Sequence, residues 1–362
     1  MVTGRTMGRR ASGGTQRKTT LREVARLAGV SPTAVSRAVN GQPGLSTGVR
    51  ARVMEIVEKS GYKPDPHLGA FFRRVRMTGR GLALLCGTAD AAAESFDARQ
   101  RDAIQAEARK AGCHVILASA STDLTPDGSL SCVADGLADA VIAVNGSREV
   151  IQNLARHVPV VSLQYEPSLD GVDCVLTDVC RGVFTQIEHL MTLGHRRIAH
   201  FVPRDKGWPH RHFLMGYEAA CNDLGLACPD AYRQTITFGY NEHARAIREV
   251  LDRVLVPGTA PTAIVTYDVY APELMRQLQE RGLCVPRDVS IVGFDDAPEF
   301  HRHCSVPLTT FRQNFDNEAF HALRLLAART PDVTIPAHSV LVAGELVIRG
   351  STAPAPKQTS AW

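Results

Sequence analysis

Residues 20–60 of this chain predict three short helices in close succession, and this order constrains the fold more than any other feature. Ser31 is a good N-cap, and Pro32 suits the first position of the second helix because the N–H that it lacks has no partner there. The first helix ends at Gly29, where a left-handed turn residue is needed. Its buried face is predicted from apolar spacing at Leu21, Val24, Ala25 and Ala28. This is the pattern of a helix-turn-helix, which places its second helix in the DNA major groove.

The outward residues of the second helix are candidates for reading DNA. Arg37 lies one turn after Thr33; arginine bridges guanine O6 and N7, and threonine contacts a polar base edge or the thymine methyl group. The predicted base-reading residues are Pro32, Thr33 and Arg37. Other polar residues are better placed for phosphate contacts, which set register rather than sequence preference: Thr20, Ser31, Ser36 and Asn40. A third helix is expected from the cap Ser46 to about Ser60.

Charge is concentrated at the same end of the chain. Residues 1–80 hold 16 Lys or Arg against 4 Asp or Glu, a net charge of +12, while the whole chain carries +4. The remaining residues therefore carry −8, so a basic segment that suits a polyanion precedes an acidic body. Residues 1–18 have four Gly and no apolar periodicity, which predicts a disordered basic tail before a DNA-binding domain at residues 19–63.

Residues 64–79 are predicted to form a hinge or linker with an unpartnered apolar side. Asp65 and Pro66 predict the start of a short helical segment that carries Leu68, Phe71 and Phe72. Two interpretations remain open. The segment orders on DNA and inserts an apolar wedge, Leu68 or Phe71, into the minor groove, or it packs its phenylalanines on the next domain.

Composition excludes several classes of protein. The 362 residues are 44% hydrophobic, but no run of 18 apolar residues and no apolar signal segment before the helices is found, which predicts a cytoplasmic chain. Nine Cys occur without a Cys-x-x-Cys pair, as expected of reduced thiols. No catalytic motif is present, which argues against an enzyme, and no cofactor is indicated. Glu299, His301 and His303 are ligand-type residues, but they come from one segment, and no metal site is predicted from them.

From residue 80 to about 350 the chain alternates apolar strands with amphipathic helices. This rhythm predicts an α/β core of two doubly wound, parallel-sheet subdomains, the second beginning after Asp178. Ligands bind such sheets at the carboxyl ends of the strands, so the loops after five strands should converge on a cleft between the subdomains: those after Cys86, Leu163, Val202, Thr266 and Phe294. Residues 351–362 are Pro-rich, show no heptad pattern and are expected to be a flexible tail.

The residues of the head resemble the lactose-repressor family of bacterial transcription regulators. The matching segments are Thr20-Leu21, Val24-Ala25, Ala28-Gly29-Val30-Ser31, Val35-Ser36-Arg37, Val39-Asn40-Gly41 and Gly61-Tyr62-Lys63-Pro64. Segments 189–199, 289–296 and 307–310 resemble the family's effector-binding core, which is similar to periplasmic sugar-binding proteins. The resemblance implies a homodimer, more often a repressor, that binds a palindromic operator in double-stranded DNA and a small, carbohydrate-like effector in the core cleft.

The same resemblance implies which residues bind the effector. Asp295 keeps the family's role as a hydroxyl acceptor, and Gln164 stands at an acidic or polar position. Phe213 replaces the arginine three residues before Gly216, with Arg211 the nearest arginine, and Tyr267-Asp268 replaces Asn-Asp. A carbohydrate-binding protein, or a DNA-binding regulator that no longer responds to a ligand, is therefore the alternative.

Overall fold

The computed structural model describes residues 21–39, 45–60, 81–86, 91–144, 146–164, 171–203, 208–236, 243–329 and 336–357. The chain divides into two compact units, Met1–Ala70 and Phe71–Trp362. Thr20, Asn40, Leu68 and Phe71, four of the residues predicted to contact DNA, lie outside the described residues.

The first unit contains the three predicted helices, α1 (Leu21–Ala28), α2 (Pro32–Val39) and α3 (Thr47–Ser60). Gly29 adopts a φ of +64° directly after α1, as the turn requires. The hydroxyl of Ser31 accepts a hydrogen bond from the Ala34 N–H at 3.2 Å, and Ser46 caps α3 in the same way. The predicted caps are confirmed, and the helices enclose a small core of Val24, Ala25, Ala28, Val35, Ala38 and Val53.

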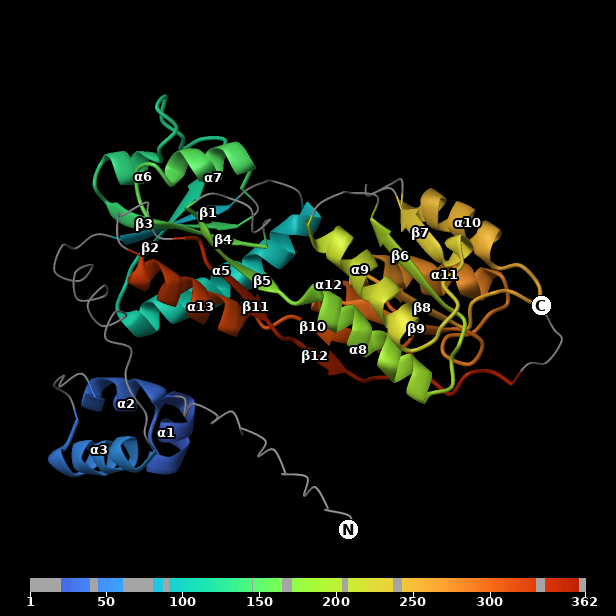
Figure 1. Cartoon of the computed structure of the whole chain (residues 1–362), viewed down its shortest axis with the longest axis horizontal. Coiled ribbons are helices and arrows are strands. Elements are labelled where there is room, and N and C mark those ends of the chain that lie inside the picture. The colour runs from blue at the N-terminus through green and yellow to red at the C-terminus, as the bar shows by residue number, and fades with distance from the viewer. Residues whose placement is uncertain are drawn as a thin grey trace, which may run out of the picture. The chain divides into compact units, whose positions relative to one another are not determined.

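The second unit contains two six-stranded sheets (Figure 1). The N-subdomain sheet has the order β11-β5-β4-β3-β1-β2 and is parallel throughout. Helices α6 and α7 cover one face, and α5 and α13 cover the other (Figure 1), as right-handed crossovers require. Its strands are β1 (Gly81–Cys86), β2 (Val115–Ser119), β3 (Ala138–Val144), β4 (Val160–Leu163), β5 (Asp173–Thr177) and β11 (Ser339–Val342). Its helices are α5 (Ala91–Ala111), α6 (Ser131–Ala134), α7 (Arg148–Leu154) and α13 (Phe315–Ala328).

The C-subdomain sheet has the order β12-β10-β9-β8-β6-β7, with one antiparallel pair, β10 and β12. Its strands are β6 (Ile198–Pro203), β7 (Arg233–Ile236), β8 (Ala263–Thr266), β9 (Ser290–Phe294), β10 (Thr309–Arg312) and β12 (Glu345–Val347). Its α-helices are α8 (Val179–Thr192), α9 (Trp208–Asp223), α10 (His243–Val254), α11 (Ala271–Glu280) and α12 (Pro298–His301), with 3-10 turns at Asp230–Tyr232 and Asp268–Tyr270. None of the helices that the structure describes combines the length and hydropathy needed to cross a bilayer.

The chain passes between the subdomains three times: from β5 to α8, from β10 to α13, and from β11 to β12. The expected restart after Asp178 is confirmed, and Asp178 caps α8 through the Arg181 N–H at 3.0 Å. Two sequential halves are nevertheless an incomplete description. Helix α13 and strand β11 return to the N-subdomain, where α13 packs on α5, β4 and β5. Each subdomain is therefore built from distant parts of the sequence.

The segment after residue 350 differs from the expected flexible tail. Ser351 is fully buried; its carbonyl accepts from the Ile291 N–H at 2.9 Å, and its hydroxyl donates to the Ile291 carbonyl at 2.6 Å. The Ala355 N–H donates to the Leu193 carbonyl at 2.8 Å. Because these bonds join the segment to β9 and to the end of α8, residues 351–355 belong to the C-subdomain, a contact that composition alone does not reveal.

Replacing Gly216 by alanine is expected to destabilise the C-subdomain. A Cβ at this position would lie 2.7 Å from the Cys180 carbonyl oxygen and 2.8 Å from its Cα, so α8 and α9 must move apart. Overpacking of this kind costs about 1–3 kcal/mol. Urea unfolding of G216A should give a lower midpoint, whereas G48A, in a helix with open space around the glycine, should not be destabilised. Equal midpoints for G216A and wild type would contradict the packing described.

Candidate functional site

Helix α2 carries the predicted base-reading positions. Arg37 is exposed on the surface of the unit, while Val35 and Ala38 of the same helix are buried in its core. Of Pro32, Thr33 and Ser36, the structure describes only the positions on α2. The guanidinium of Arg50 in α3 donates to the carbonyls of Arg37 and Ala38 at 3.5 and 3.1 Å. These bonds satisfy two of the last carbonyls of α2 and fix α2 against α3.

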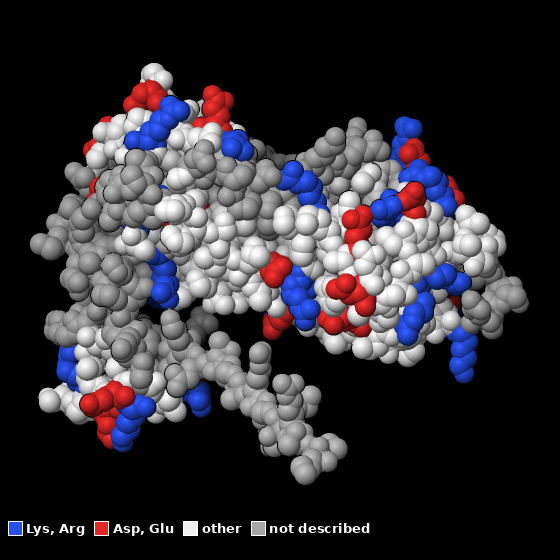
Figure 2. Space-filling view, in the orientation of Figure 1, with Lys and Arg blue, Asp and Glu red and all other residues white. Residues whose placement is uncertain are grey.

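Figure 2 shows basic and acidic side chains side by side on the visible face of the second unit. Exposed ion pairs of the second unit include Arg233 with Glu218 and Arg245 with Glu249. No extended basic surface is visible among the described residues of that face.

Two predicted effector residues, Gln164 and Asp295, come from different subdomains and meet through a third side chain. Gln164 directly follows β4 of the N-subdomain, and Asp295 directly follows β9 of the C-subdomain. Gln313, directly after β10, has its Nε2 2.6 Å from Asp295 Oδ1, and its Oε1 lies 3.2 Å from Gln164 Nε2. The structure thus brings the ends of β4 and β9 together at the boundary between the subdomains.

The backbone at Asp295 and Asp296 adopts an unusual conformation. Their φ angles are 118° and 49°, in the left-handed region that non-glycine residues rarely adopt. Nη1 of Arg99, in α5 of the N-subdomain, donates to both of their carbonyl oxygens at 3.0 and 3.1 Å. The Arg99 guanidinium also lies 5.2 Å from the centre of the Phe315 ring. A strained backbone persists only where its surroundings hold it in place. Here an arginine of one subdomain stabilises the strained loop of the other.

The next residue, Asp296, is held by two arginines. Its carboxylate oxygens lie 2.6 Å from Arg349 Nη2 and 2.6 Å from Arg312 Nε. Partial burial acts to raise the pKa of Asp296, but the hydrogen bonds from Arg349 and Arg312 outweigh it and lower the pKa. Asp296 is therefore an ionised anchor for the loop.

Asp268 also serves the loop after β9. Its side chain is fully buried, and its Oδ2 accepts from the Ala297 N–H at 2.8 Å and lies 2.6 Å from His301 Nε2. Its Oδ1 accepts from the Thr310 hydroxyl at 2.6 Å. Burial raises the pKa of Asp268 against the opposing effect of these donors. Because both oxygens are engaged within the C-subdomain, Asp268 positions the loop that contains Asp295.

Phe213 and Tyr267 belong to an aromatic cluster. Their ring centres are 5.1 Å apart, and the ring centre of Phe294 lies 5.8 Å from that of Phe213 and 5.7 Å from that of Tyr267. Phe213 is fully buried and Tyr267 is 9% exposed. Arg211 is exposed, as expected for a residue two positions from Phe213 on a helix. The structure therefore brings Phe213 and Tyr267 together and separates Arg211 from them.

Sequence reasoning missed a buried polar cluster beside the segments that connect the two subdomains. Its members are each at most 8% exposed: Gln100, Gln164, Thr177, Gln313 and Glu318. The Glu318 carboxyl accepts from Gln100 and Gln164 at 3.0 and 2.8 Å. Burial raises the pKa of Glu318 to about 7. The available sequence signal is an acid at position 318 beside the apolar face of a helix that buries Ala319, Ala322 and Leu323.

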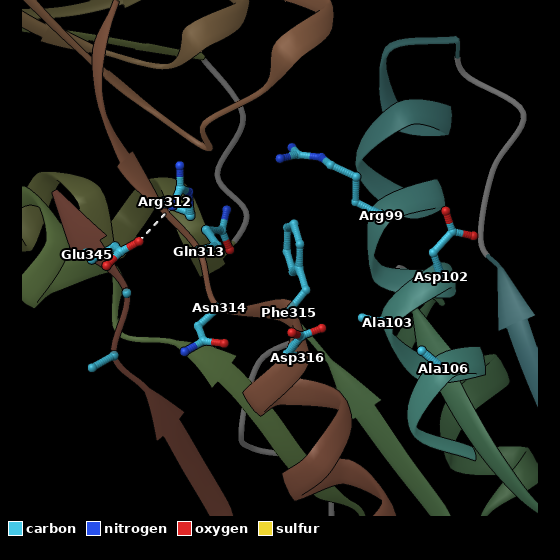
Figure 3. A pocket seen from close by; sticks show the side chains of 12 residues that line it. Arg99, Asp102, Ala103, Ala106, Arg312, Gln313, Asn314, Phe315, Asp316 and Glu345 are labelled. Atoms are coloured by element: carbon cyan, nitrogen blue, oxygen red, sulfur yellow. Dashed lines mark hydrogen bonds and ion pairs between the residues drawn. The ribbon is translucent and has the colours of Figure 1, made fainter. Parts of the chain in front are cut away.

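A cavity of about 660 Å³ lies between α5 and the crossover from β10 to α13 (Figure 3). Arg99, Asp102, Ala103 and Ala106 line it from α5, and residues 312–316 and 343–345 line it from the crossovers. Figure 3 shows Phe315 between the two walls, on the same side as Gln313. None of the six predicted effector residues lines this cavity, although Arg99 and Gln313 connect it to Asp295.

Among the described residues, no three His, Cys, Asp or Glu side chains lie together as a metal site would require. Of the ligand-type residues in segment 299–303, His301 is bonded to Asp268, and the His303 ring accepts from Arg302 at 3.2 Å.

Replacing Asp268 by alanine is expected to destabilise the core by about 3–5 kcal/mol, because three buried or half-buried donors lose their acceptor. The free energy of unfolding from urea titration is the measurement. D223A, which removes an exposed carboxylate at the end of α9, is the control and should change it by less than about 0.5 kcal/mol. A similarly small change for D268A would contradict the positioning role.

Comparison with known protein families gives two matches. The family described as bacterial regulatory proteins of the lacI family matches residues 20–65, which contain α1, α2 and α3. A periplasmic binding protein-like domain matches residues 187–352, from α8 to the segment after β12.

Curated proteins and solved structures agree with these matches. The ribose operon repressor of Escherichia coli K12 is 27% identical over 342 residues, which cover 92% of this chain and 99% of that protein. The structure of a complex of the transcriptional regulator CelR with cellobiose has a TM-score of 0.62 at 23% identity and covers 92% of this chain and 100% of that one. The lac repressor dimer bound to operator and an anti-inducer has a TM-score of 0.59 at 22% identity, with coverage of 93% and 100%. Both structures share the fold. With the head and the core both matched in the order that the family has, this chain belongs to the lacI family of bacterial regulatory proteins.

Proposed function

We propose that this protein is a sequence-specific transcriptional regulator, and that it acts as a repressor by binding a palindromic operator as a homodimer. A carbohydrate-like molecule in the core cleft changes its affinity for DNA. The observation that carries the proposal is the capped helix α2, which presents Arg37 on its exposed face and is fixed by Arg50 against α3.

Charge supports the division of labour between the two units. The net charge of +12 on residues 1–80 favours a polyanion, and the net charge of −8 on the remainder does not. We assign base reading to Pro32, Thr33 and Arg37, and phosphate contacts to Thr20, Ser31, Ser36 and Asn40. Because Ser31 uses its oxygen to cap α2, its hydroxyl proton is available to a phosphate. Leu68 and Phe71 are proposed as the minor-groove wedge of the hinge.

For the effector, we propose Asp295 as the main hydroxyl acceptor. Its Oδ1 is engaged by Gln313, while its Oδ2 accepts no hydrogen bond from the described residues. Gln164 would contribute from the opposite subdomain, and Phe213 and Tyr267 would form an apolar wall. Asp268 would act by positioning Asp295, and Arg211 would contribute at the rim. Relatives named for ribose and cellobiose support a sugar as the first class of ligand to test.

One observation favours a second candidate, a regulator that does not respond to a ligand. Gln164 and Gln313 bond to one another and to neighbouring side chains. In the aromatic cluster, the rings of Phe213 and Phe294 contact that of Tyr267. An enzyme or a solute-binding protein without DNA affinity is disfavoured by the DNA-binding head and by the lack of a catalytic motif in the sequence.

The test of the main proposal is selection of bound sequences from a random duplex pool by the full-length protein, at about 0.15 M salt to suppress non-specific binding. Enrichment of a palindrome with half-sites one helical turn apart, or a multiple of that, is expected. Absence of any enriched sequence would contradict sequence-specific regulation.

Arg37→Ala is expected to weaken binding to the selected site by about 1–3 kcal/mol and to relax the preference at one base of each half-site. Affinities for the selected site and for each single-base variant, measured by fluorescence anisotropy, test this. R52A, which removes an exposed arginine of α3, should leave the base preferences unchanged. A loss of affinity that is uniform over all sequences would make Arg37 a phosphate contact instead.

If the core binds a sugar effector, adding cellobiose or ribose should change the affinity for DNA by a factor of about 5–150. In D295A this factor should fall to one, because the hydroxyl acceptor is missing. Circular dichroism of D295A controls for folding. If neither sugar nor a wider carbohydrate panel changes the affinity of the wild type, the second candidate is favoured.

A further inference from the structure

A continuous chain of hydrogen bonds links Asp295 of the C-subdomain to Glu318 of the N-subdomain. Asp295 Oδ1 lies 2.6 Å from Gln313 Nε2, and Gln313 Oε1 lies 2.5 Å from the Thr177 hydroxyl. The same hydroxyl lies 2.5 Å from Glu318 Oε1. Thr177 ends β5 and Gln313 follows β10, so the chain of bonds runs beside two of the three crossing strands.

The number of protons available to these hydrogen bonds limits how the four side chains can be arranged. Thr177 has one hydroxyl proton but makes two short oxygen–oxygen contacts, each of which requires a proton between the atoms. If Thr177 donates to Gln313, a proton on Glu318 must donate to Thr177. If Thr177 donates to Glu318, the Gln313 amide must turn and donate to Thr177. Gln164 then loses its bond to the Gln313 oxygen and keeps those to Thr177 and Glu318. Its oxygen then faces Asp295, which must carry the proton.

We propose that Asp295 and Glu318 share one proton through Gln313 and Thr177, and that this relay holds the two subdomains together. In one orientation of the relay the proton is on Glu318 and Asp295 is ionised; in the other it is on Asp295 and Glu318 is ionised. Loss of the proton leaves two carboxylates and too few donors, which favours separation of the subdomains.

On balance, the surroundings of the two carboxyls support retention of the proton. Arg99 donates to the backbone carbonyls of Asp295 and Asp296, not to the Asp295 carboxyl, and its positive charge acts to lower the pKa of Asp295 against the larger effect of burial. Asp268 is paired with His301, and Asp296 with Arg312 and Arg349. Glu299, on α12, acts with Asp268 to favour the neutral form of Asp295. Among the described residues, no ion pair reaches the carboxyls of Asp295 or Glu318, and burial raises the pKa of both.

The relay gives the candidate effector site a mode of regulation. A ligand hydroxyl that donates to Asp295 favours the ionised form of that residue and therefore the orientation with the proton on Glu318. This consequence rests on the proposed function. The relay itself depends only on the hydrogen bonds between Asp295, Gln313, Thr177 and Glu318, and it is tested without DNA or sugar.

The experiment is thermal unfolding of the full-length protein between pH 5 and pH 8, for wild type, E318Q, D295N and the double variant. A carboxyl whose pKa is higher in the folded state contributes stability at low pH, and this contribution is lost as the pH rises from the unfolded pKa through about 7. The melting temperature of E318Q relative to wild type should therefore rise by about 4–8 °C over this range. Buried histidines are common to all variants and cancel in the difference.

The double variant distinguishes a shared proton from two independent buried acids. The asparagine introduced by D295N cannot carry the shared proton, so D295N should reduce the pH dependence as E318Q does, and the double variant should add nothing further. Additive effects, or a D295N variant that keeps the full pH dependence of wild type, would overturn the relay.

Should D295N fail to fold, T177V replaces it: the loss of the hydroxyl should also reduce the pH dependence, and a wild-type profile for T177V overturns the relay. E149Q, at an exposed position of α7, is the matched control and should follow wild type.

Discussion

The contact between the two subdomains of the core depends on hydrogen bonds that lie beside the three segments connecting them. Crossovers connect the subdomains but do not fix the angle between them, because a few backbone torsions can change that angle. What fixes it here are buried and half-buried hydrogen bonds of Arg99, Gln164 and Gln313 at the boundary. In a low-dielectric interior such bonds are costly to leave unmade, so the cluster favours one arrangement over a continuum of intermediates.

The same boundary explains why the loop after β9 tolerates an unfavourable backbone. Asp295 and Asp296 have left-handed φ angles, and the surroundings fix both residues: Asp268 holds Ala297, Arg312 and Arg349 hold Asp296, and Arg99 holds the two carbonyls. All but one of these contacts lie within the C-subdomain. Only Arg99 comes from the other subdomain, so separation of the subdomains removes a single support and leaves the loop otherwise in place.

Local features of the fold could be predicted from the sequence, and non-local ones could not. The Ser31 cap, the Gly29 turn and the Asp178 cap depend on residues within four positions, and the structure confirms each one. Asp295 could be named as a candidate from the sequence because an acid at a strand's carboxyl end suggests a site. Thr177 and Gln313 are 136 residues apart, and only the return of α13 to the N-subdomain brings Glu318 to them. No pattern of period two or 3.6 contains that information.

The aromatic cluster around Phe213 and Tyr267 bears on both proposals for the core, a regulator that responds to a ligand and one that does not. Because Phe213 is fully buried against Tyr267 and Phe294, the aromatic cluster contributes packing energy that does not require a ligand. On the polar side of the boundary, Gln164, Thr177 and Gln313 likewise already bond to one another. A sugar must therefore displace bonds that the chain already makes, and its affinity is the difference between two sets of contacts. The proton shared by Asp295 and Glu318 enters that difference directly, since it decides whether Asp295 accepts or donates when a ligand hydroxyl arrives.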